Sequence, residues 1–260
     1  SGWMLMGVPG LAYTTGISGL WIAVGLTLGT WANWKFVSRR LRKPTEVASD
    51  SLTLPDYLKN RFHDQSHSVA VISALFILIF FLIYTSSGFV AGGKLFNTIF
   101  GLDYTLSLFI TAGIVVFYTF LGGFLAVSWT DCIQGALMFF AILAVPITAA
   151  MYLGGPIETM QLIQSEFPQG LNLFGDTSDM FALIIGIISS LGWGLGYFGQ
   201  PHILVRFMAI SDAKELKKST NIAMVWVILS LLAAIFVGLI GNVYMLPERL
   251  VGTDAETIFL

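Results

Sequence analysis

A stretch of 26 residues without a formal charge, Met180 to Val205, constrains the fold of this chain more than any other feature. At about 1.5 Å of rise per helical residue, it is long enough to cross a hydrocarbon core of about 30 Å. Its second half opposes a regular helix, because glycines and a proline weaken helix interiors. Backbone groups freed inside a membrane must be satisfied by protein, water or a ligand. The stretch therefore predicts a discontinuous membrane helix beside a polar cavity, with a glycine-rich packing helix as the other interpretation. The residues that weaken it are Gly192, Gly194, Gly196, Gly199 and Pro201.

Two aromatic residues and that proline recur at four-residue intervals in the same stretch. They are Trp193, Tyr197 and Pro201. If a regular helix continued this far, all three side chains would share one face. They are the first candidates for a binding site.

The composition indicates an all-α integral membrane protein. Hydrophobic residues make up 56% of the chain and charged residues 11%, whereas soluble domains carry roughly 25% charge. A net charge of −2 does not indicate a nucleic-acid partner. The single Cys132 excludes an internal disulfide, and the three histidines show no metal-ligand spacing. Since the chain opens inside an apolar run, we expect it to be a piece of a longer protein.

The uncharged runs divide into seven membrane elements. The first run is too long for one span, and the small polar residues from Thr14 to Gly19 predict a turn inside it. Gly122 and Gly123 predict a second division, and Pro55 favours a short interfacial helix from Leu54 to Phe62. The predicted elements are Ser1–Tyr13, Leu20–Val37, Ser68–Gly93, Tyr104–Leu121, Ser128–Leu153, the stretch that begins at Met180, and Asn221–Tyr244.

The basic residues give this topology an orientation. If the spans alternate, 11 of the 13 Lys and Arg residues fall on one side, with Lys94 and Arg249 on the other. The positive-inside rule then places the basic loops 38–66 and 206–218 in the cytoplasm. The loop 154–179, which carries acidic residues and no Lys or Arg, lies outside.

The first and sixth elements are both interrupted by glycine and proline and cross in opposite directions. This pattern is typical of an inverted repeat, in which two five-helix bundles each begin with a broken helix and the site lies where the breaks meet. We therefore predict a first repeat over residues 1–153 with its first helix truncated, an outer loop over 154–179, and the start of a second repeat over 180–260.

Several segments resemble one transporter family. LGWGLGYFGQPHILVRFMA in the sixth element, SGWMLMGVPG at the start, LTLPDYLKNRF, and YTFLGGFLAVSWTDCIQ are similar to segments of the sodium:solute symporter family, and of its bacterial sodium/proline symporters above all. The resemblance implies a leucine-transporter-like five-plus-five helical bundle in the bacterial inner membrane. It implies Na⁺ as coupling ion, L-proline or a similar small solute as substrate, no organic cofactor, and further C-terminal helices beyond residue 260.

The resemblance also implies roles for individual residues. It assigns Trp193, Tyr197 and Pro201 to the substrate site and its outer gate, and Ser1 with Gly2 to the substrate region. Sodium coupling falls to Ser1 and Asp131, and Tyr84 matches a position tied to transport. For Asp131 an interfacial place at the start of the fifth span is an equal alternative, and Tyr84 is also explained by helix packing.

Other functional classes fit the residues less well. An enzyme would need a carboxylate cluster, a metal-ligand set or a nucleophile with its base, and the predicted spans contain no such group. A channel would show a continuous polar lining. Within carriers, a symporter of the same family for pantothenate, a sugar or another amino acid is the alternative.

Overall fold

The computed structural model describes residues 2–175, 177 and 179–260, and these residues form helices and connecting turns without a strand. They divide into two compact units, each built from separate stretches of the chain. Unit 1 comprises Ser1–Leu20, Thr85–Leu183 and Leu229–Leu260. Unit 2 comprises Trp21–Tyr84 and Ile184–Ile228.

Five continuous helical runs in the described chain are long and apolar enough to cross a membrane. They are Trp3–Val47, Ser68–Phe100, Tyr104–Tyr152, Met180–Phe198 and Leu216–Tyr244. Two of these runs contain a glycine at positive φ that ends one helix and begins another: Gly16 (φ 66°) and Gly123 (φ 52°). The runs therefore hold seven segments, and the predicted divisions at Thr14–Gly19 and Gly122–Gly123 are confirmed.

Unit 1 is built around α1 (Val8–Thr15). Val8, Ala12 and Tyr13 of this helix are fully buried, and so are Ala234 and Val243 of α10. α1 is continuous with a π-helical turn, η1 (Trp3–Gly7), and is followed by the 3₁₀ turn η2 (Gly16–Gly19). The other elements of the unit are the end of α5 (Ser68–Phe100), α6 (Tyr104–Tyr152), α7 (Pro156–Glu166), η4 (Pro168–Leu171), the end of α10 (Leu216–Tyr244) and η6 (Gly252–Thr257).

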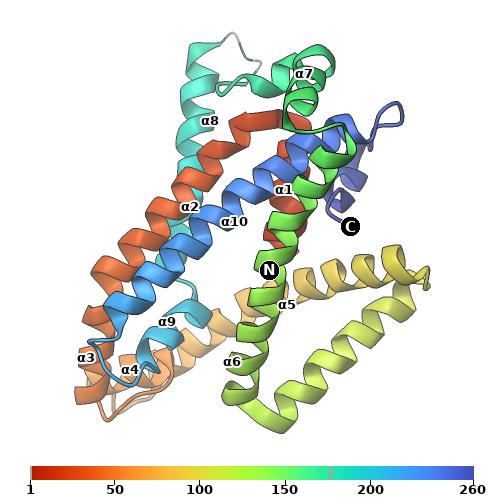
Figure 1. Cartoon of the computed structure of the whole chain (residues 1–260). Coiled ribbons are helices and arrows are strands. Elements are labelled where there is room, and N and C mark those ends of the chain that lie inside the picture. Colours follow the sequence, from red (N-terminus) through yellow and green to blue (C-terminus); the bar gives the residue numbers. More distant parts are fainter. Residues whose placement is uncertain (1, 176, 178) are drawn as a thin grey trace. The chain divides into compact units, whose positions relative to one another are not determined.

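α6 bends sharply at the second predicted division, Gly122–Gly123 (Figure 1). The helix begins at Asp103, whose side chain accepts a hydrogen bond from the Leu106 amide. It turns sharply at Gly123, where ψ is −145°, and continues to Tyr152. Its most apolar part is not covered by other described residues, and Phe120 is 87% exposed. Such a surface is unfavourable in water but is suited to hydrocarbon.

Unit 2 has its core where α9 (Pro201–Met208) contacts α3 (Arg39–Val47) and α4 (Leu54–Arg61). Phe207 and Met208 are almost fully buried there beside Leu41 and Tyr57, and the Trp34 and Phe207 rings meet edge to face at 4.6 Å. The remaining elements are α2 (Leu20–Ala32), the π-helical η3 (Asn33–Ser38), the start of α5, α8 (Met180–Gly192), η5 (Trp193–Phe198) and the start of α10.

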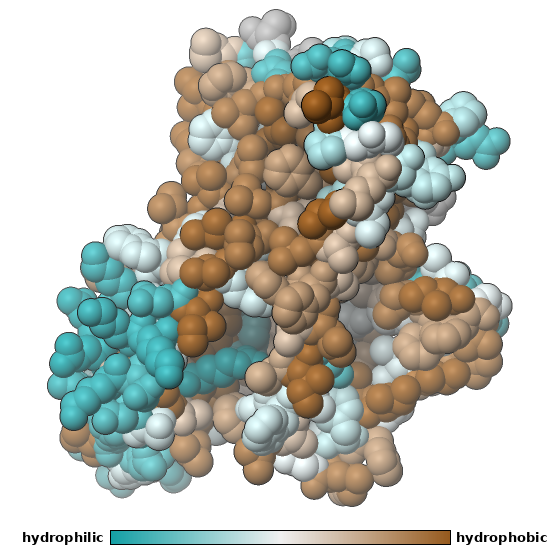
Figure 2. Space-filling model, in the orientation of Figure 1, coloured by the Kyte–Doolittle hydropathy of each residue, from teal (hydrophilic) through white to brown (hydrophobic). Residues whose placement is uncertain are grey.

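The predicted short helix after the basic segment is confirmed as α4. Thr53 caps its N-terminus by accepting a hydrogen bond from the Asp56 amide at 3.2 Å, and Pro55 occupies the first turn. Lys59 and Arg61 lie in the last turn, where they complement the helix dipole. Figure 2 shows a hydrophilic surface over α3 and α4 and a hydrophobic one over α2 and α8.

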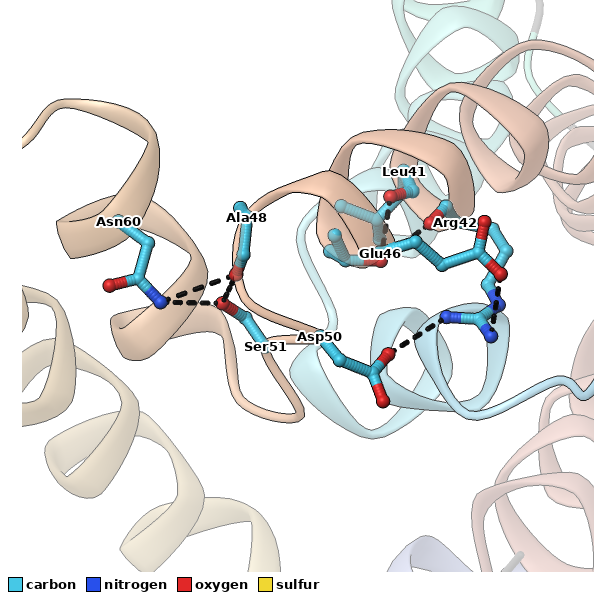
Figure 3. Close-up of polar contacts among 8 residues, drawn as sticks. Leu41, Arg42, Glu46, Ala48, Asp50, Ser51 and Asn60 are labelled. Carbon is cyan, nitrogen blue, oxygen red and sulfur yellow. Dashed lines mark hydrogen bonds and ion pairs between the residues drawn. The ribbon is translucent and has the colours of Figure 1, made fainter.

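The basic loop expected from residue 38 is helical as far as Val47. Arg42 stabilises this extension, since its guanidinium pairs with Glu46 one turn later at 2.9 Å and with Asp50 at 3.4 Å. Asn60 of α4 then donates to Ser51 at 2.9 Å and to the Ala48 carbonyl (Figure 3). The connection is therefore an ordered helix–turn–helix.

Three other boundaries differ from the prediction. The acidic loop contains α7, which starts at Pro156 after Gly155 at φ 120° and has Glu158 in its first turn; all three features favour a helix start. The third span continues to Phe100 instead of Gly93. The seventh begins at Leu216, so Lys217 and Lys218 are helical.

Candidate functional site

The helix that begins at Met180 breaks where its glycines predict. α8 ends at Gly192, the next turn is the 3₁₀ element η5, and Gln200 is extended (φ −79°, ψ 110°) before α9 starts at Pro201. A 3₁₀ helix has about three residues per turn, so Trp193 and Tyr197 lie roughly a third of a turn apart. The shared face for Trp193, Tyr197 and Pro201 therefore does not form, because the regular helix that it requires ends at Gly192.

Glycines of α2 allow its backbone to approach this break closely. A Cβ on Gly29 would lie 2.2 Å from the Gly194 carbonyl oxygen, and one on Gly25 would lie 2.6 Å from the Leu191 Cα. The reverse also holds, since a Cβ on Gly194 would lie 2.0 Å from the Gly25 oxygen. Backbone-to-backbone contact of this kind is how small residues join membrane helices.

An asparagine holds the broken segment from the same side. Asn33, only 1% exposed, donates from Nδ2 to the Tyr197 carbonyl oxygen at 2.8 Å. Its Oδ1 is buried with no hydrogen-bond partner among the described residues. One helical turn earlier, the buried Thr30 hydroxyl lies beside the Tyr197 side chain. The sequence analysis missed Asn33, because nothing local to it indicates a partner so far along the chain.

Aromatic rings gather next to the start of α9. The His202 imidazole stacks on the Tyr84 phenol ring with centroids 5.3 Å apart, and the Phe81 ring meets it edge-on at 5.6 Å. Tyr84 also lies near Tyr197. The structure thus brings together Tyr84, Tyr197 and the residue that follows Pro201. His202 is a second contributor, to which the sequence analysis assigned no role.

The candidate residues differ in exposure. Trp193 is 51% exposed and Tyr84 49%, whereas Tyr197 and Pro201 are half-buried. Aromatic rings that are partly exposed beside a helix break are available to contact a small ligand.

The other predicted residues belong to unit 1. Gly2 packs against α5, where an added Cβ would lie 2.7 Å from the Ala91 Cβ. Asp131 lies exposed on the second segment of α6, eight residues after the Gly123 break. Ser1 lies outside the described residues.

The architecture and the site define a class: a multi-pass helical membrane protein with a helix broken in mid-span, as in secondary transporters. The chain belongs to the sodium:solute symporter family, whose model matches residues 1–257. The predicted all-α membrane fold is confirmed with it.

Individual relatives of this chain are transporters by name. It is 51% identical over 260 residues to the high-affinity proline transporter PutP of Bacillus subtilis (strain 168), covering 54% of that protein. It is 50% identical to the osmoregulated proline transporter OpuE of the same organism, covering 52%. It is 48% identical to sodium/proline symporter 2 of Staphylococcus saprophyticus, covering 50%. All of this chain aligns in each case, so it spans about half the length of the curated relatives that it matches.

Proposed function

We propose that the protein carrying this chain takes up L-proline with Na⁺ across the bacterial cytoplasmic membrane. The helix break from Trp193 to Gln200 is the observation that carries the proposal. Membership of the family and the names of the relatives support the coupling ion and the substrate. The basic segments 38–66 and 206–218 then face the cytoplasm, where positive charge gathers.

The break suits the chemistry of proline. Proline is a zwitterion with a compact apolar ring, and interrupted helices offer N–H groups to a carboxylate and carbonyl groups to an ammonium. Trp193 and Tyr197 supply flat apolar area for the ring. Tyr84, which lies near Tyr197 and stacks on His202, extends this aromatic surface.

Sodium is a hard cation and prefers oxygen ligands, as Ca²⁺ and Mg²⁺ do. In this proposal Ser1 and Gly2 belong to the sodium and substrate region at the first element, and Asp131 contributes to coupling. Sodium that orders the first element favours substrate binding, and the reciprocal effect follows from linkage. Rocking of one predicted repeat against the other then gives alternating access.

Uptake of labelled proline into vesicles that contain the full-length protein tests the proposal. We expect saturable uptake that requires an inward sodium gradient. Uptake that does not saturate indicates a channel, and a chemically altered product indicates an enzyme. Pantothenate, a sugar or another amino acid that is transported in place of proline supports the alternative symporter of the same family.

Single substitutions test the site within the same assay. Trp193→Ala should raise the proline KM by about two- to twelvefold, since an aromatic contact contributes about 0.5–1.5 kcal/mol. Trp129→Ala is the matched control, because Trp129 is comparably exposed (64%) on α6 and has no assigned role. Equal KM values for both variants would remove Trp193 from the site.

A further inference from the structure

Two buried asparagines make the same contact in the two units. Asn33, which directly follows α2, donates from Nδ2 to the Tyr197 carbonyl oxygen at 2.8 Å. Asn242, near the end of α10, donates from Nδ2 to the Tyr13 carbonyl oxygen, also at 2.8 Å. The two residues are 1% and 5% exposed. Each contact joins a tyrosine carbonyl of an interrupted element to the end of a neighbouring helix.

The two asparagines also share an unfavourable feature. The Oδ1 atom of each is buried with no hydrogen-bond partner among the described residues. An unpaired buried acceptor lowers stability, and a leucine of similar shape would have no such acceptor. Stability alone therefore does not explain an amide at these positions. What the amide provides is the hydrogen bond from its Nδ2 to the tyrosine carbonyl.

Small residues precede each asparagine by four and eight positions. In α2 they are Gly29 and Gly25, and in α10 they are Gly238 and Ala234. A Cβ on Gly238 would lie 2.2 Å from the Pro9 carbonyl oxygen, as close as one on Gly29 would lie to the Gly194 oxygen. In both helices the small residues bring backbones together, and the asparagine one turn later reaches across. We call each arrangement an asparagine clasp: Gly25, Gly29 and Asn33 in unit 2, and Ala234, Gly238 and Asn242 in unit 1.

The clasps connect the predicted repeats crosswise. The second element of the first repeat, which contains α2 and Asn33, contacts the sixth element of the chain. That sixth element, which contains Tyr197, is the first element of the second repeat. The seventh element, the second of that repeat, holds the first element of the chain. A twofold relation between repeats requires this exchange of partners, so the clasps support the inverted repeat.

One difference separates the two clasps. Tyr197 lies inside the break between Gly192 and Pro201 and is itself a candidate substrate residue. Tyr13 lies in regular α1, two residues before its end, and its hydroxyl accepts a hydrogen bond from the Leu250 amide at 2.8 Å. Only the Asn33 clasp therefore fixes backbone next to candidate substrate residues.

We propose that Asn33 is a positioning residue for the substrate site, which holds the Tyr197 backbone at the break and thereby sets where Trp193 and Tyr197 stand. The inference rests on the proposed function. Asn242 performs the same structural task away from the substrate, which makes it a natural control within the same protein.

The experiment compares Asn33→Leu with Asn242→Leu in the full-length protein, with Asn221→Ala on exposed α10 surface as reference. Both leucine variants lose one buried hydrogen bond, so their melting temperatures should change by similar amounts. The proline KM should rise at least about fivefold in Asn33→Leu and stay within about twofold of the unchanged protein in Asn242→Leu. Asn33→Ser, which keeps a hydroxyl donor in a smaller side chain, should fall between.

The outcomes separate the hypotheses. Equal KM changes in the two leucine variants, or none in either, overturn the positioning role and leave sodium-dependent proline uptake intact. No such uptake by the unchanged protein overturns the proposed function and this role with it. If Asn33→Leu does not reach the membrane, Asn33→Ser and Asn242→Ser replace the leucine pair: the proposal requires a higher proline KM in Asn33→Ser than in Asn242→Ser, and equal values overturn it.

Discussion

The His202 imidazole stacks on the Tyr84 phenol ring, with centroids 5.3 Å and planes 23° apart. This contact joins α5, in the third span, to the first turn of α9 directly after Pro201. Tyr84 can therefore influence the broken helix, because a change in its ring alters the packing of His202 in the first turn of α9. The family resemblance assigned Tyr84 a role but did not identify the residue that it contacts.

A double-mutant cycle measures this contact. Tyr84→Ala and His202→Ala should each raise the proline KM of the full-length protein, and the double variant should raise it by less than the product. The expected coupling is about 0.5–1.5 kcal/mol, the range for aromatic pairs. Tyr152→Ala is the control, since its ring meets Tyr244 at 5.6 Å in unit 1. Multiplicative effects would show that Tyr84 and His202 act independently.

Gly194 and Gly192 provide a matched pair at the break. A Cβ on Gly194 would lie 2.0 Å from the Gly25 carbonyl oxygen, whereas one on Gly192 meets nothing within 4 Å among the described residues. Gly194→Ala must separate α2 from the break, so we expect overpacking of about 1–3 kcal/mol and strongly reduced uptake. Gly192→Ala should retain uptake. Thermal unfolding of the purified variants gives the stability, and similar melting temperatures would contradict the close packing.

Much of the helical layout was predictable because it depends on local properties. The length of an uncharged run limits a span, and glycine and proline mark where helices stop. The breaks at Gly16, at Gly123 and after Gly192 follow from these two facts. The extension of the helix to Val47 was not predictable in this way, because a run of basic residues favours a loop and the pairing of Arg42 with Glu46 one turn later offsets that tendency.

The contacts within the site were not predictable in the same way. Asn33 and Tyr197 lie 164 positions apart, and no local pattern connects them. The 3₁₀ geometry of η5 was not predictable either, since it occurs where Gly194 packs on α2, which lies far away in the sequence. A single sequence, considered without those of its relatives, contains the residues that make such contacts. It does not indicate which of these residues contact one another.

Acid should loosen the turn that precedes α5. The Asp64 carboxylate accepts hydrogen bonds from the Ser66 hydroxyl at 2.6 Å and from the Val69 amide at 2.8 Å. These bonds lower the pKa of Asp64 from its ordinary value of 3.8, the Ser66 hydroxyl contributing most. A lowered folded pKa stabilises the turn above pH 3.8, and that contribution is lost as the pH falls through the folded value.

Hydrogen exchange measures this effect locally. Protection of the amides at the start of α5, corrected for intrinsic exchange, should fall below about pH 4 in the unchanged protein. In Asp64→Asn protection should be lower at neutral pH and should not change over the same interval. The same acid-dependent loss in both proteins would show that another group controls the turn.

Gly123 offers the sharpest stability test, because backbone conformation and side-chain space can be separated there. Its φ of 52° and ψ of −145° are outside the regions open to other residues, yet an added Cβ would meet nothing within 4 Å among the described residues. Any loss in Gly123→Ala therefore measures backbone strain, expected at about 1–3 kcal/mol. Gly113→Ala has equal space on the same α6 but lies within regular helix, so it should be neutral or stabilising by up to about 1 kcal/mol. Size-exclusion profiles of the heated full-length variants should show Gly123→Ala losing its native peak at a lower temperature than the unchanged protein, and Gly113→Ala at the same or a higher one. If the two variants melt together, the division between the fourth and fifth spans does not depend on the positive φ of Gly123.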